Sequence, residues 1–241
     1  MDQTLGMASQ RKLYDLAGAD PLRRFSPYCW RAKLALAHKG LSVETVPWRF
    51  TEKDVIAFAG STTVPVIRDG DTVVADSWRI ALYLDQAYPQ RPALFGGPEA
   101  QTLCEFFASW AFRAVHPVAL KVVLPDLFAR IHDKDKPYFR ESREKRFGAT
   151  LEAYAAEAKQ NLAALRGALE PVRPVLVQNA FLSGNGPGYA DYILFGVFQW
   201  ARAVSPIRLL EPDDPLYAWR ERMLDLWGGH ARSAKGFPVW A

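Results

Sequence analysis

Residues 26–31, with the sequence Ser-Pro-Tyr-Cys-Trp-Arg, place a hydroxyl and a thiol in the first turn of a predicted helix. Ser26 is a favoured N-cap residue, and Pro27 suits the first helical position, where its missing N–H has no intrahelical partner. A helix start presents unpaired N–H groups and partial positive charge, so it can stabilise an anion such as a thiolate. Ser26 and Cys29 also have the spacing of a thioredoxin-type Cys-x-x-Cys motif whose first position holds serine. The stretch is therefore either a thiolate site or an N-cap followed by a small buried cysteine.

Two motifs further along the chain could hold a ligand. Val64–Pro65 opens a β-branched run, which is either a plain edge strand or, with a cis bond, a place where the backbone of Val64 can pair with an extended peptide. Asp76 and Ser77 precede a predicted helix. They are either a helix cap or a site for the α-amino and α-carboxyl groups of an amino-acid-like ligand. Local sequence leaves both alternatives open for each motif.

Other chemistry-bearing residues favour structural roles. The four histidines lack metal-ligand spacing, so we predict no metal site. The glycine-rich loop 184–188 follows no strand and lacks a Lys-Ser/Thr pair, which argues against a phosphate cradle. The mixed-sign run 140–146 has helical spacing and indicates a solvated helix face. Asp191, in an apolar helix start, is predicted to cap the backbone before it.

The elements that must position these motifs fall into two groups. Up to residue 87 the order is βαβαββα, with strands at 12–16, 42–47, 64–67 and 72–75, and with Asp69-Gly70 as a hairpin turn. Beyond it the β signals fade, and we predict helices over 99–130, 140–169, 189–203 and 214–227, with Pro117 and Pro125 as kinks or ends of the first and Pro171 and Pro174 ending the second. The fold class is thus α/β plus all-α. We predict a disordered tail at 1–11, a first domain at 12–87, a linker at 88–98 and a helical domain at 99–241.

Composition indicates a soluble globular protein. Of the 241 residues, 49% are hydrophobic and 23% charged, and the net charge of +4 is interspersed rather than collected in a tract, so no nucleic-acid partner is predicted. No apolar run reaches membrane-spanning length, and the first ten residues lack the apolar segment of a signal peptide. Cys29 and Cys104 form no disulfide or zinc framework. We therefore expect a cytoplasmic protein without a membrane partner.

Taken together, the motifs resemble the glutathione transferase superfamily over nearly the whole chain. Residues 12–87 are similar to its thioredoxin-like domain and residues 99–241 to its all-helical domain. The resemblance implies glutathione as cosubstrate, Asp191 as the helix-capping acid, a role in detoxification and a homodimer. It implies Ser26 as the catalytic serine, and the implied glutathione-binding residues are Ser26, Val64, Pro65, Asp76 and Ser77.

Four segments resemble one particular group within this superfamily. Residues 26–31, 75–80, 138–147 and 188–193 are similar to bacterial β-etherases of lignin breakdown and to their fungal relatives. Those enzymes use glutathione to cleave β-aryl ether bonds in α-keto lignin dimers. One departure is Gly188, which stands where a Ser or Thr N-cap usually precedes the capping acid. It bears on local stability rather than on function.

The resemblance implies a mechanism in which the hydroxyl of Ser26 donates to the glutathione sulfur and the thiolate attacks an aromatic electrophile. We expect the acceptor pocket to lie between the domains, lined by Leu16, Phe25, Tyr28, Phe107, Trp110 and Arg113. Two alternatives remain: a thiol oxidoreductase that uses Cys29, and a non-catalytic carrier of aromatic ligands.

Overall fold

The first part of the chain forms a four-stranded mixed sheet. A computed structural model describes residues 11–156 and 158–238, so all of the predicted tail except Arg11 lies outside the described residues. The strand order is β2-β1-β3-β4; β1 runs parallel to β2 and antiparallel to β3, and β3 and β4 form a hairpin. The strands are β1 (Lys12–Leu16), β2 (Glu44–Trp48), β3 (Val66–Asp69) and β4 (Thr72–Ala75).

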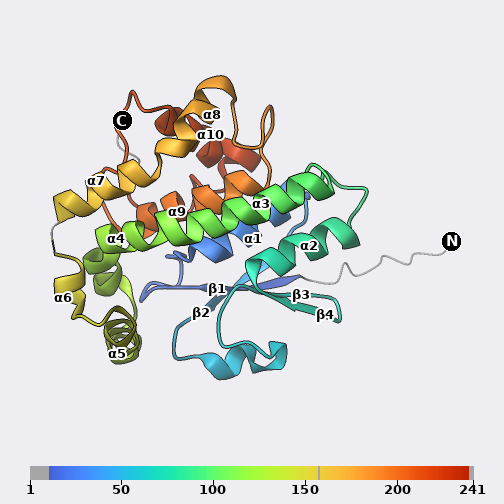
Figure 1. Ribbon diagram of the computed structural model, residues 1–241. Helices are drawn as coiled ribbons and strands as arrows, with labels where there is room; N and C mark the ends of the chain where they lie inside the picture. The colour runs from blue at the N-terminus through green and yellow to red at the C-terminus, as the bar shows by residue number, and fades with distance from the viewer. Residues whose placement is uncertain (1–10, 157, 239–241) are drawn as a thin grey trace.

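Helices cover both faces of this sheet. The α-helices α1 (Pro27–His38) and α2 (Ser77–Ala87) lie on one side, and a 3-10 helix over Lys53–Ala59 lies on the other (Figure 1). The turn between β3 and β4 passes through Gly70 at φ 60°, as expected for the predicted Asp-Gly hairpin. The predicted order βαβαββα and the thioredoxin-like fold are confirmed, with the second helix in the 3-10 form.

The rest of the chain is helical, as predicted. Its longest helix is continuous from Pro98 to Arg130 and contains one π-helical turn over Ala111–Val115. The helices are α3 (Pro98–Trp110), α4 (His116–Arg130), α5 (Lys136–Phe147), α6 (Leu151–Tyr154), α7 (Ala158–Ala168), α8 (Arg173–Gln178), α9 (Tyr189–Val204) and α10 (Pro215–Gly229), with short 3-10 turns over Asp133–Asp135 and Glu170–Val172.

One expectation for this part was wrong. The single helix predicted over 140–169 is divided into α5, α6 and α7, because Gly148 adopts the left-handed conformation (φ 68°) that ends α5. The last of these helices ends at Ala168, just before Pro171 and Pro174, as predicted, and both prolines occupy the first turns of the short helices that follow. Pro117 lies in the first turn of α4 and Pro125 inside it, and neither ends the long helix.

The continuous helix Pro98–Arg130 has the length and composition to cross a membrane, since its most apolar stretch reaches a mean hydropathy of 1.2. We did not expect any such run from the sequence. In the fold its two halves pack against α9, and α4 also packs against α7. A core helix of a soluble protein meets the same measure.

The most buried helix, α9, holds the start of α1 in place. These two helices pack closely along their lengths. A Cβ atom added at Gly196 would lie 2.5 Å from the carbonyl oxygen of Pro27, inside van der Waals contact. Only glycine therefore lets α9 approach the first turn of α1, and this approach links the helical part to the turn that carries Ser26.

Asp191 caps the start of α9 as predicted. Its buried carboxylate accepts hydrogen bonds from the backbone N–H groups of Leu182, Ser183 and Gly188 at 2.7 to 3.1 Å, and from Trp219 Nε1 at 2.9 Å. The departure at Gly188 has a steric cause. A Cβ atom there would lie 2.5 Å from Ser183 Oγ, so a serine or threonine N-cap does not fit.

Candidate active site

A cavity of about 650 Å³ opens beside the first turn of α1, within the size range of small-molecule sites, roughly 300–1,000 Å³. Ser26, Tyr28, Val64, Pro65 and Asp76 line it from the thioredoxin-like part, together with Leu16, Phe25 and residues 59–63. The wall from the helical part consists of Phe112, His116, Leu120, Leu127, Tyr138, Phe139, Arg143, Arg146 and Trp200. The cavity therefore lies between the two parts of the chain.

Ser26 caps α1 and faces the cavity. Its backbone is extended, and its Oγ accepts a hydrogen bond from the backbone N–H of Cys29 at 3.2 Å, as expected for an N-cap. Because this bond uses an oxygen lone pair, the hydroxyl proton can still be donated to a ligand. Ser26 is only 3% exposed, so a bond to it is shielded from bulk water.

The segment before β3 offers a free backbone. The peptide bond between Val64 and Pro65 is cis. Among the described residues, neither the N–H nor the C=O of Val64 forms a hydrogen bond, although both Val64 and Pro65 line the cavity. An extended ligand could pair with these two groups as a neighbouring strand would. The backbone N–H of Asp76 donates to the carbonyl of Pro65 at 3.1 Å and joins this segment to the start of α2.

Asp76 has an unusual backbone conformation at the N-cap of α2. Its φ is 80° and its ψ 133°, outside the left-handed helical region and rarely adopted by any residue with a side chain. Its Oδ1 accepts from the backbone N–H groups of Trp78 and Arg79 at 2.9 and 3.1 Å. Asp76 is exposed and lines the cavity. Ser77 is buried beside it, is not among the lining residues, and its carbonyl accepts from Tyr189 Oη at 2.6 Å.

Cys29 lies behind this surface. Its side chain is fully buried, and burial, followed by the nearby negative charge of Asp15, raises the pKa of its thiol far above the usual range. A reactive cysteine needs access and a low pKa. The geometry thus gives no support to the alternative in which Cys29 is the reactive thiol.

Aromatic rings cluster at the helical wall of the cavity. The ring of His116 stacks on Trp200, with centroids 5.0 Å apart and an interplanar angle of 22°. The rings of Tyr28 and Phe112 lie 5.6 and 6.2 Å from it. Burial, followed by the charges of Arg31 and Arg146, lowers the pKa of His116 to about 4. Its imidazole is therefore neutral at pH 7, so it forms part of an uncharged aromatic surface.

The structure brings only some of the predicted pocket residues together. Leu16, Phe25 and Tyr28 line the cavity, whereas Phe107, Trp110 and Arg113 are not among its lining residues. The face that lines it carries Phe112, His116 and Leu120 instead, roughly half a turn around the same helix from Trp110. The π-helical turn Ala111–Val115 lies between these faces and changes the residue count per turn.

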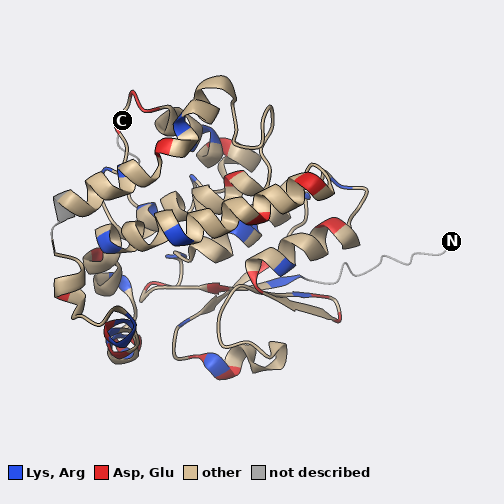
Figure 2. Ribbon diagram, viewed as in Figure 1, with Lys and Arg blue, Asp and Glu red and all other residues tan. Residues whose placement is uncertain are grey.

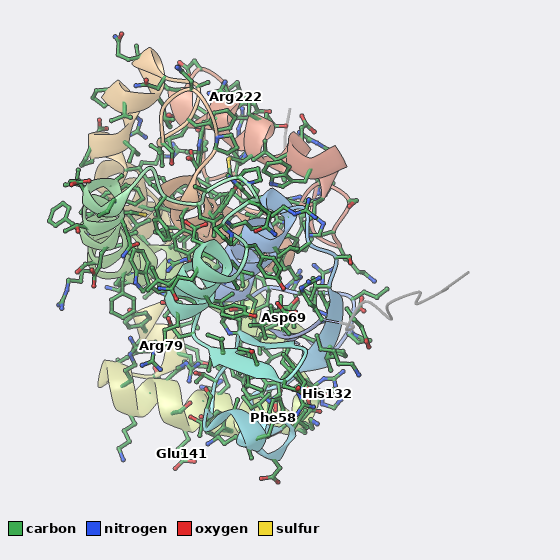
Figure 3. The ribbon with its side chains drawn as sticks, turned by 90° about the vertical axis from the view of Figure 1, so that its right-hand side faces the viewer. Phe58, Asp69, Arg79, His132, Glu141 and Arg222 are labelled. Carbon is green, nitrogen blue, oxygen red and sulfur yellow. The ribbon has the colours of Figure 1, made fainter. Side chains whose placement is uncertain are left out.

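Sequence reasoning missed the contribution of α5. The charges of both signs on this helix are visible in Figure 2, and Glu141 points away from the molecule in Figure 3. However, Phe139, Arg143 and Arg146 line the cavity. Their spacing of four and three residues places them on one helix face, and this apolar-basic periodicity was the available signal. The mixed-sign run is thus a solvated face on one side only.

Family comparisons agree with this geometry. A family model described as the glutathione S-transferase N-terminal domain matches residues 25–87, and a model of the C-terminal domain matches residues 102–209. The two matches together span more than two thirds of the chain. The chain belongs to the glutathione S-transferase superfamily.

Individual relatives are distant in sequence. A protein of rice (Oryza sativa subsp. japonica) named probable glutathione S-transferase GSTU6 is 26% identical over 210 residues, which is 82% of this chain and 80% of that protein. The crystal structure of glutathione transferase GSTFuA2 from Phanerochaete chrysosporium has a TM-score of 0.73 at 27% identity, covering 92% and 93% of the two chains. The glutathione S-transferase CsGST63524 of Ceriporiopsis subvermispora, solved in complex with glutathione, shares the fold with a TM-score of 0.77 at 24% identity, covering 90% and 96%.

Proposed function

We propose that this protein is a glutathione transferase that activates the glutathione thiolate for attack on an aromatic electrophile. The observation that carries the proposal is that the hydroxyl of Ser26, the backbone of Val64 and the carboxylate of Asp76 line one cavity, and that this backbone has no partner within the described part of the chain. These groups match the thiol, the peptide backbone and the ammonium group of glutathione. A related protein, CsGST63524, has been solved with glutathione bound.

In this proposal, Asp76 and Ser77 hold the γ-glutamyl end and Val64 pairs with the cysteinyl backbone. The hydroxyl of Ser26 donates a hydrogen bond to the thiolate sulfur, which lies at the N-terminal, positive end of α1. A free thiol has a pKa of roughly 8.5, and lowering it by about two units requires roughly 2.7 kcal/mol of differential stabilisation. One charge-assisted hydrogen bond and a helix N-terminus together supply a free energy of that order.

The finer part of the proposal is cleavage of β-aryl ethers. The sulfur would form a bond to the carbon that carries the aryl ether, and the bond from this carbon to oxygen would break. The aryloxide would leave with the electron pair of that bond. The aromatic wall of Tyr28, Phe112, His116 and Trp200 supports an aryl substrate, since offset and edge contacts between rings are favourable.

The test is a pair of glutathione-dependent assays on the purified protein. One measures release of a fluorescent phenol from an α-keto β-aryl ether, and the other measures conjugation of 1-chloro-2,4-dinitrobenzene. Turnover of both supports the etherase, and turnover of the chloroarene alone supports the transferase without the etherase. Binding of aryl ligands without turnover in either assay would contradict the proposal and favour the carrier alternative.

The homodimer and the cytoplasmic location also remain predictions. Leu103 and Phe106 are 70% and 75% exposed and lie on one face of α3, where a second copy of the chain could cover them. Light scattering after size-exclusion chromatography should give the mass of a dimer. Phe106→Glu should reduce this mass to that of the monomer, whereas Glu105→Lys on the same helix should leave it unchanged.

A further inference from the structure

Two arginines of α5 enter the cavity without a carboxylate partner. Arg143 and Arg146 both line it, and neither forms an ion pair within the described part of the chain. The hydrogen bond that Arg143 donates to a side chain goes to the neutral hydroxyl of Ser142 at 3.0 Å. Arg140 on the same helix differs, because it pairs with Glu144 and Glu152 at 2.8 Å each. The ion-paired Arg140 is not among the cavity-lining residues, whereas Arg143 and Arg146 are.

Arg143 lies among aromatic rings, where a cation without a carboxylate partner is costly. Its guanidinium stacks over Phe50 at 5.4 Å and over Phe139 at 4.8 Å, and both rings line the cavity. Burial lowers the pKa of Arg143; nearby Tyr138 opposes this shift, and the positive charge of Arg146 adds to it. A half-buried cation beside a second cation is unfavourable unless an anion joins them.

Arg146 connects this pair to the aromatic cluster. Its charge acts on both Tyr28 and His116, whose rings contact each other. Among the described residues that line the cavity, Asp76 carries the one carboxylate, and it is already engaged with the backbone of α2. Arg79, labelled in Figure 3, adds a third positive charge to the lining. The cavity therefore combines an uncharged aromatic surface with an excess of positive charge.

We propose that the helical wall of this cavity selects aromatic acceptors that carry a carboxylate, which Arg143 and Arg146 bind while the ring lies against His116 and Trp200. This inference rests on the proposed transferase function and names its substrate class. Guanidinium groups suit it because their planar fork matches the geometry of a carboxylate.

The experiment compares two electrophiles that differ in one charge, 4-chloro-3-nitrobenzoate and its methyl ester, with glutathione as nucleophile. The quantity measured is the ratio of kcat/KM for the acid to that for the ester, which removes any common effect on glutathione activation. In the double variant Arg143→Gln/Arg146→Gln this ratio should fall at least tenfold through the KM of the acid. The kcat/KM for the ester should change by less than twofold.

Control variants test whether a change in the ratio comes from the cavity-lining arginines. Lys145→Gln removes the same charge from the same helix at an exposed position outside the cavity lining, and its ratio should stay within twofold of the unmodified protein. If Arg143→Gln fails to fold, the exposed Arg146→Gln alone should still lower the ratio about threefold. An unchanged ratio in every arginine variant would overturn the inference and leave the transferase function intact.

Two further outcomes separate the inference from the proposed function. A KM for glutathione that rises equally with both acceptors would assign the arginines to a glutathione carboxylate and overturn the inference. Calorimetry without glutathione should show that the unmodified protein binds the unreactive 4-methyl-3-nitrobenzoate and does not bind the methyl ester of this compound. The Kd for 4-methyl-3-nitrobenzoate should rise at least tenfold in the double variant. If these results are obtained but no acceptor is turned over, the carboxylate-binding site is supported and the transferase function is rejected.

Discussion

The two walls of the cavity present different kinds of chemical group to a ligand. The thioredoxin-like wall includes the hydroxyl of Ser26 and the carboxylate of Asp76, each at a helix N-cap, and the backbone of Val64, which has no hydrogen-bond partner among the described residues. The helical wall offers rings and guanidinium groups from α4, α5, α9 and the π-helical turn between α3 and α4. Groups on the first wall suit one invariant peptide-like ligand. Groups on the second suit a variable aromatic partner.

This contrast has a physical reason. A backbone group keeps its position whatever side chain it carries, so a site made from caps and turns binds one ligand in one orientation. Side chains projecting from helices can change without altering the fold, so they are suited to specificity. If the contrast is correct, substitutions on the first wall should change the binding or activation of glutathione, and substitutions on the second wall should change the KM for the acceptor.

The largest expected effect is that of Ser26→Ala. Loss of the hydroxyl donor should lower kcat/KM at least tenfold with every acceptor, because the thiolate loses a charge-assisted hydrogen bond. The variant also loses the N-cap of α1, which costs about 1 kcal/mol, so thermal unfolding must accompany the kinetics. Ser26→Thr keeps both the cap and the donor and should retain most activity. Unchanged kinetics in Ser26→Ala would remove Ser26 from the catalytic role.

Asp76→Asn should raise the KM for glutathione about tenfold and leave the KM for the acceptor unchanged. Asparagine keeps the side-chain oxygen that caps α2 and has nearly the size of aspartate, so the main change is the loss of charge. The measurement is initial rates with each substrate varied in turn. A rise in the acceptor KM alone would contradict the division between the two walls.

On the helical wall, Phe112→Ala should raise the acceptor KM about fivefold with no change for glutathione, since an aromatic contact contributes roughly 1 kcal/mol. Phe107→Ala is the informative comparison, because the sequence predicted this residue in the pocket. The structure predicts a smaller effect there. A larger effect of Phe107→Ala would show that the wrong helix face has been assigned to the wall.

The last prediction concerns the pH dependence of stability at His116, with no effect on the KM for either substrate. Its folded pKa of about 4 lies below the unfolded value of about 6.5, so the unfolded chain binds more protons between these values. The free energy of unfolding should therefore rise with pH from about 4 to 6.5, by at most about 3 kcal/mol from this group. His116→Phe should remove this part of the slope in urea titrations across the range. An identical slope in the variant would mean that folding does not lower the pKa of His116.

The sequence predicted the first wall better than the second. Ser26, Val64, Pro65 and Asp76 stand in short motifs whose local chemistry already limits their conformations, and all of them line the cavity. Arg143 and Arg146 stand in a mixed-sign helix in which their spacing from Phe139 marks one face. That spacing does not say what the face contacts, because this depends on how α5 packs against the rest of the fold.

The sequence by itself determined the order of elements, the two-part fold and the motifs at the starts of α1, β3 and α2, because caps, proline and turn residues act within a few residues of each other. Only the tertiary structure decided which face of the long helix and of α5 lines the cavity. The long helix lines the cavity with Phe112 and His116 instead of Phe107 and Trp110, and α5 lines it with Arg143 and Arg146. The close approach of Gly196 to Pro27 likewise joins residues far apart in the chain, and it positions the helix start on which the proposed chemistry depends.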